Sequence, residues 1–137
     1  CFESTPSVTL SFAVLTTSLL FGGMTLYSFG FAAFLFTVLP AETAGATLRR
    51  AFPMFYLFVF VTAALASALL WRHNLLAGLL MALVAITTVP ARQILMPAIN
   101  LATDHGQRSR FKWLHALSVV VTLVHIGAAG YVLVSLV

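Results

Sequence analysis

The polar residues best placed for chemistry lie together near the end of the sequence. His115, Ser118, Thr122 and His125 follow one another at steps of three, four and three residues, which puts all four on one face of a helix. Such a row can carry protons or bind a polar ligand, and its imidazoles can ligate a metal. It also has a structural interpretation, which we favour: the hydroxyls bond to helix carbonyls and the neutral histidines link neighbouring helices.

Haem or metal ligation by this row is an alternative with a geometric difficulty. His115 and His125 are ten residues apart, about 15 Å along a helix, so they cannot hold one iron between them. The remaining histidines, His73 and His105, fall in polar segments, and the four methionines are scattered. We therefore predict no metal site and no cofactor, with haem or a metal at His115 or His125 as the weaker possibility.

Other signatures of catalysis are missing from the sequence. There is no nucleophile–base pair, no glycine-rich phosphate loop and no carboxylate inside an apolar segment. A proton-coupled carrier usually needs such a carboxylate. Arg92 follows Pro90 near the end of an apolar segment, where an arginine that extends toward the membrane surface is favoured over a transport site. An enzymatic activity is therefore left open but not favoured.

The composition places most of these residues in lipid. Hydrophobic residues make up 61% of the 137 residues and charged residues only 7%, whereas a soluble domain carries roughly 25% charged residues. This excludes a soluble enzyme. It also excludes a nucleic-acid-binding module, which would need basic runs with interleaved aromatic residues.

Four apolar segments are long enough to cross a membrane, because one span needs about 20 residues. Pro40 ends the first segment, and Pro53 is tolerated in the first turn of the second. The third can continue past Pro90 as a kinked, amphipathic end. The short connections predict one transmembrane domain over residues 1–137, an all-α, antiparallel four-helix bundle. The predicted spans are residues 8–39, 51–71, 75–97 and 111–137.

The basic residues predict the orientation of this bundle. The connections over residues 41–50 and 100–112 should face the cytoplasm, matrix or stroma, because they hold or border almost all of the basic residues. Both termini then lie on the opposite side, where Arg72 is the only basic residue. The six residues expected to anchor the positive side are Arg49, Arg50, Arg92, Arg108, Arg110 and Lys112.

The N-terminal part of the sequence contains the only cysteine, Cys1, so no internal disulfide can form. A lipidated terminus is one interpretation of this cysteine, and a processed or truncated boundary is another. The apolar segment that follows is too long for a signal peptide and lacks its basic leading region. We therefore expect a retained helix.

Two segments resemble the signatures of a known family. The stretch over residues 39–56 contains Ala44-Gly45 and Phe52-Pro53 and is similar to "AG…L…FP.Y", and residues 111–118 are similar to "F..LH..S". Both resemble the family of small four-helix membrane proteins that includes transmembrane protein 205, a domain of unknown function. The likeness covers roughly residues 21–137, although that family often has asparagine where this chain has Thr122. The resemblance implies a four-helix membrane fold and a loose association with tolerance to platinum drugs.

Three functions follow from these observations. The favoured one is a non-catalytic accessory subunit of a larger membrane complex, such as an energy-transducing respiratory or photosynthetic complex. Its expected partners are the lipid bilayer and other membrane protein subunits, and not nucleic acid. The second is a stand-alone factor in metal-drug tolerance or small-solute export. The third is a haem- or metal-binding redox protein that uses His115 and His125.

Overall fold

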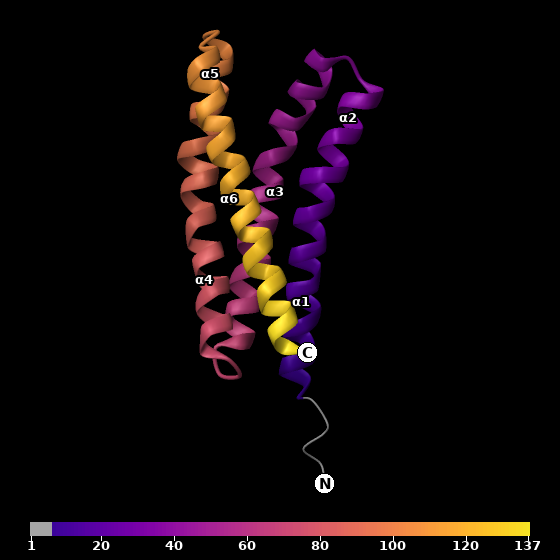
Figure 1. Cartoon of the computed structure of the whole chain (residues 1–137), viewed down its shortest axis with the longest axis vertical. Coiled ribbons are helices and arrows are strands. Elements are labelled where there is room, and N and C mark those ends of the chain that lie inside the picture. The colour runs from indigo at the N-terminus through magenta and orange to yellow at the C-terminus, as the bar shows by residue number, and fades with distance from the viewer. Residues whose placement is uncertain (1–6) are drawn as a thin grey trace.

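The computed structural model describes residues 7–137, and every element in this range is helical. The predicted all-α four-helix bundle is confirmed (Figure 1). All four long helices are long and apolar enough to cross a membrane. The first consists of α1 (Val8–Thr25), the π-helix η2 (Leu26–Phe31) and α2 (Ala32–Val38); the second is α3 (Ala41–Leu70); the third consists of α4 (Leu75–Pro90), the π-helix η3 (Ala91–Leu95) and α5 (Met96–Asp104); the fourth is α6 (Arg108–Leu136).

The second long helix begins at Ala41, earlier than the predicted start at residue 51. The prediction that residues 41–50 form a connecting loop is therefore wrong. Ala44 and Leu48, one turn apart, are buried and pack with Leu35 of α2 in a small separate core. This contact with α2 supports the extra helical turns, and the actual connection between the two helices is the extended pair Leu39 and Pro40.

The third long helix also runs further than predicted, to Asp104 rather than residue 97. A proline ring clashes with the carbonyl four residues before it, so the regular α-helix is interrupted ahead of a proline. The π-helix η3 lies just before Pro97 and is that interruption. Its wide turn is closed by the Met96 N–H, which donates to the Ala91 carbonyl five residues earlier. Because α5 ends only at Asp104 and α6 begins at Arg108, most of residues 100–112 are helical. The prediction that this segment is a loop is therefore wrong.

A tight turn of three residues joins α5 to α6. Gly106 has a positive φ of 65°, a conformation that only glycine adopts readily. The Gln107 N–H donates to the Ala102 carbonyl at 2.9 Å, and the Gly106 N–H donates to Thr103 at 3.2 Å. This is the Schellman ending of a helix, and it fixes the direction in which α6 begins.

The tightest packing is in the hairpin formed by α3 and α4. A Cβ atom added at Gly78 would lie 2.8 Å from the Trp71 Cα, so the turn allows no side chain there. The Ser67 hydroxyl also donates to the Gly78 carbonyl at 2.8 Å. In the apolar parts of the second and third long helices 39% of the residues are buried, against 17% in the first and fourth. The outer pair therefore presents most of its surface to the surroundings.

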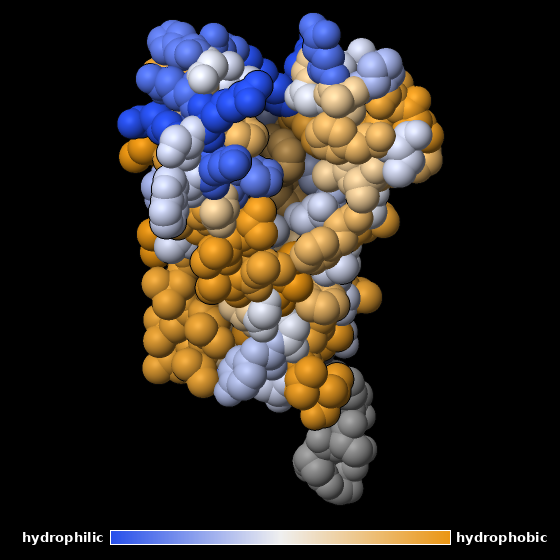
Figure 2. Space-filling view, turned by 45° about the horizontal axis from the view of Figure 1, so that its top comes forward, coloured by the Kyte–Doolittle hydropathy of each residue, from blue (hydrophilic) through white to orange (hydrophobic). Residues whose placement is uncertain are grey.

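The bundle is closed at one end and divided at the other. Figure 1 shows α6 crossing from α5 at one end to α1 at the other, while α2 and the start of α3 lean away from α5. Figure 2 shows that the surface is hollowed between these two arms and that hydrophilic side chains gather over the arms at this end. We call this end, which holds Arg49, Asp104 and Arg108, the basic end.

Candidate functional site

His125 is the one member of the predicted histidine row whose side chain is buried inside the bundle. Its side chain is 5% exposed, and its Nε2 lies 2.7 Å from the Thr87 hydroxyl of α4. The Thr87 hydroxyl has a single hydrogen, which it donates to the Leu83 carbonyl at 2.6 Å. His125 Nε2–H is then the donor to Thr87. The imidazole links α6 to α4.

The other three members of the row have different surroundings. Thr122 is half-buried and faces the Tyr56 hydroxyl of α3. Ser118 donates to the His115 carbonyl of its own helix at 2.7 Å. His115 is exposed and stacks on Phe111, with ring centroids 5.5 Å apart. The row shares a helix face as predicted, but the crossing of α6 places only its second half against neighbouring helices.

The row does not gather ligands around one point. His115 is exposed near the basic end and His125 is buried further along α6. Among residues 7–137, no group of three or more His, Cys, Asp or Glu side chains is close enough to hold a metal ion together. Haem or a metal at His115 or His125 stays a prediction.

A polar group that the sequence analysis missed lies in the π-helix η2. Tyr27 stacks on Phe55 with ring centroids 4.5 Å apart, and the edge of Phe52 meets it at 5.5 Å. The hydroxyl oxygens of Tyr27 and Ser28 are buried and have no hydrogen-bond partner within the described residues. The only sequence signal was a tyrosine and a serine together in an apolar segment, next to Gly30.

Arg92 is held between the third and second long helices. Its Nε donates to the Pro53 carbonyl of α3 at 3.1 Å, and its Nη1 donates to Gln93 at 2.9 Å. Arg92 lies about three turns before the end of α5. The residue acts as a link between helices here.

One ion pair joins the two arms of the basic end. Both terminal nitrogens of Arg49 donate to the two carboxylate oxygens of Asp104, at 2.7 and 2.8 Å. Arg49 lies on α3 and Asp104 at the end of α5, so the pair connects elements that diverge in Figure 1. Both side chains are almost half exposed. The bidentate geometry fixes their relative position, although exposure to water limits what it adds to stability.

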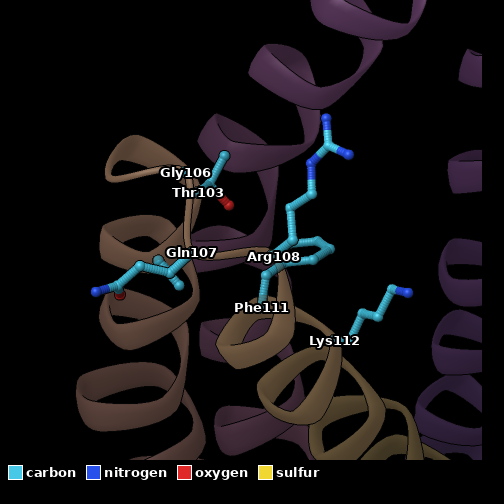
Figure 3. Close-up of a pocket in the computed structure, with 7 residues that line it drawn as sticks. Thr103, Gly106, Gln107, Arg108, Phe111 and Lys112 are labelled. Atoms are coloured by element: carbon cyan, nitrogen blue, oxygen red, sulfur yellow. The ribbon is translucent and has the colours of Figure 1, made fainter.

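The remaining predicted anchors, Arg50, Arg108, Arg110 and Lys112, are exposed at the basic end. Arg108 and Lys112 also line a pocket of about 340 Å³ at the turn between α5 and α6. Figure 3 shows both side chains directed to the same side of α6, with Gln107 directed away from them. The structure thus places these four basic residues and Arg49 at one end of the bundle.

A family model covers most of this arrangement. A domain of unknown function, DUF4149, matches residues 15–108, well over half of the chain. The chain belongs to the DUF4149 family. No curated protein and no solved structure matches it. The resemblance to a family of unknown function is confirmed at this level, and the kinship with transmembrane protein 205 stays a prediction.

The DUF4149 match contains most of the polar contacts described above. It includes η2 with Tyr27 and Ser28, the Arg92 link and the Arg49–Asp104 pair, and it ends at Arg108, the first residue of α6. The histidine row lies after the matched residues. The links between the first three long helices therefore belong to the DUF4149 domain itself.

Proposed function

We propose that this DUF4149 protein is a non-catalytic accessory subunit that packs its outer helices against other proteins of a larger membrane complex. One observation carries the proposal. Two of the polar side chains that were candidates for chemistry link helices of the bundle: His125 bonds to Thr87, and Arg92 donates to the Pro53 carbonyl. Ser118 bonds within its own helix. In a membrane such links between helices stabilise helix association, because lipid gives helices no hydrophobic drive to pack.

The outer helices have open glycine positions that the chain itself does not use. A Cβ atom added at Gly22 of α1 or Gly127 of α6 would meet nothing within 4 Å. Both lie at the level where Phe21 contacts Gly130, beside the seam between α1 and α6. Glycine in a lipid-facing helix lets another backbone approach closely. These positions support contact with a transmembrane helix of a partner protein.

The test is to place a large side chain at Gly22 or Gly127 and to measure the size of the complex that contains the protein. Gly22→Leu and Gly127→Leu should each reduce the share of the protein that migrates with larger proteins on a native gel after gentle detergent extraction. The bundle itself should remain stable, because the space is open. Gly45→Leu is the matched control, since its Cβ also meets nothing within 4 Å but lies at the basic end of α3. Wild-type protein that migrates alone as a small species would contradict the proposal.

We also propose that the basic end faces the cytoplasm, matrix or stroma. Five of the six basic anchors lie at this end, Arg92 lies about three turns further along the third long helix, and Arg72 lies in the turn at the other end. This asymmetry matches the bias of basic residues toward the side from which a membrane protein inserts. Gln107→Cys should then react with an impermeant maleimide only from the cytoplasmic side of sealed vesicles, and His73→Cys only from the other side, both in a Cys1→Ser background. The reverse labelling pattern would contradict this orientation.

A further inference from the structure

The turn between α5 and α6 frames a mainly apolar pocket that is bordered by two basic residues. Its wall combines two basic side chains with an aromatic ring and small residues, and its volume is about 340 Å³. Pockets that hold small molecules begin at roughly 300 Å³. The residues that line it are Ala102, Thr103, Gly106, Gln107, Arg108, Phe111 and Lys112.

None of the described residues neutralises the two basic side chains that border this pocket. Arg108 and Lys112 make no ion pair with any residue among 7–137. The nearby carboxylate is Asp104, but both of its oxygens accept hydrogen bonds from Arg49. Arg108 and Lys112 lie one helical turn apart, a spacing that makes two side chains neighbours on a helix surface, and both extend on the same side of α6 (Figure 3).

The placement of these cations is costly without an anion. Arg108, Arg110 and Lys112 all lie in the first two turns of α6, and the first turn contains no acidic residue. The positive end of a helix favours anions and disfavours cations. A bound anion would reverse this, since the side chains and the helix would then act on it together.

The apolar side of the pocket identifies the kind of anion. Phe111 and Ala102 give the pocket a hydrophobic wall. Trp113, two residues beyond Phe111, is 77% exposed, and tryptophan in membrane proteins gathers at the headgroup level. Trp113 therefore predicts that the pocket lies at the depth of the lipid headgroups, with two basic residues and an apolar surface side by side. A guanidinium and an ammonium together suit a phosphate, which accepts paired hydrogen bonds from arginine and a point charge from lysine.

We propose that this pocket binds a phosphate group, with Arg108 and Lys112 as its ligands. Two sources have the same chemistry: the headgroup of an anionic phospholipid, and free phosphate from the aqueous side. Phe111 contacts the part of a lipid next to its phosphate, a contact that free phosphate does not need. This site is separate from the helix surfaces in the proposed function and does not depend on a partner protein.

The experiment is a titration of the purified full chain, followed by native mass spectrometry, with phosphatidylglycerol, with phosphatidylcholine and with inorganic phosphate. The double variant Arg108→Gln/Lys112→Gln removes both ligands. Arg50→Gln/Arg110→Gln is the matched control, because it removes the same charge from the same end and neither residue lines the pocket. All four side chains are exposed, so neither variant should disturb folding.

The expected result is stronger binding of phosphatidylglycerol than of phosphatidylcholine. The pocket variant should weaken phosphatidylglycerol binding roughly 10- to 30-fold, given the loss of two basic side chains at an anionic headgroup, while the control changes it by no more than about 3-fold. Displacement of the lipid by millimolar inorganic phosphate would identify free phosphate as a competent source; retention of the lipid would identify the headgroup. Equal loss in both variants would overturn the proposal, because it would mean general attraction to the basic end. Failure of the wild type to bind either probe would overturn it too.

Discussion

The bond between Thr87 and His125 makes a sharp prediction, because its two partners are not equivalent. The Thr87 hydroxyl donates to the Leu83 carbonyl and accepts from His125. Removing the imidazole leaves the hydroxyl with its carbonyl partner. Removing the hydroxyl leaves the imidazole of a residue that is only 5% exposed without its partner. Thr87→Val should therefore destabilise the bundle more than His125→Leu does.

The size of the effect follows from these contacts. Hydrogen bonds between membrane helices contribute about 0.6 kcal/mol on average and up to about 1.7 kcal/mol, and an unsatisfied buried donor costs about 1–3 kcal/mol. We expect Thr87→Val to lower the free energy of unfolding by about 1–2 kcal/mol. His125→Leu should cost less than about 1 kcal/mol, because leucine fills similar space and is well accommodated in an apolar interior. The double variant should resemble His125→Leu.

The measurement is reversible unfolding in mixed micelles of the four proteins of this double-mutant cycle. Thr88→Val is the matched control, since Thr88 is buried and bonds only to the Val84 carbonyl within α4. It should remain close to wild type, because such bonds within a helix add little. If Thr87→Val and Thr88→Val behave alike, or if His125→Leu is the costlier change, the link between α6 and α4 is not what holds His125. A visible absorption band lost in His125→Leu would instead favour the redox interpretation.

Three further predictions concern the two ends of the bundle. Gly78→Ala should destabilise the bundle by about 1–3 kcal/mol, because the added Cβ would lie 2.8 Å from the Trp71 Cα. Gly45→Ala should stabilise the bundle by up to about 1 kcal/mol, because the added Cβ meets nothing within 4 Å. Thermal unfolding measures both effects. Arg49→Gln should speed hydrogen exchange in the first turns of α3, and the charge reversal Arg49→Asp with Asp104→Arg should restore protection. High salt should raise the same exchange rates in the wild type and leave them unchanged in Arg49→Gln, because an exposed ion pair is screened.

The number and type of the elements could be predicted from the sequence, but two of their limits could not. The apolar lengths and Pro40 were enough to predict four helices. Residues 41–50 were predicted to be a loop because they contain charged residues. A membrane span is recognised by a run of about 20 apolar residues, and this segment does not belong to such a run. They are helical because Ala44 and Leu48 pack on Leu35, a contact that exists only once α2 and α3 fold back on each other.

The candidate site could be predicted in composition but not in arrangement. The spacing of the histidine row correctly put its members on one helix face. Which part of that face meets a neighbour depends on how α6 crosses the bundle (Figure 1), and no periodicity within α6 encodes a crossing angle. The pairing of Arg49 with Asp104 could be assigned only once the folded position of α5 was known. Tyr27 was missed because η2 changes the helical register just where it lies.

The two ends of the bundle are held by interactions of different kinds, and this division is consistent with both proposals. At the hairpin end, backbone and small side chains of α3 and α4 are in direct contact around Gly78, and packing of this sort does not depend on salt or ligands. At the basic end, the arms diverge and one exposed ion pair joins them. Adding an anion beside Arg108 would neutralise charge at this weaker end without altering the hairpin. The tight end therefore fixes the shape of the bundle, and the basic end is where the proposed phosphate group would act on it.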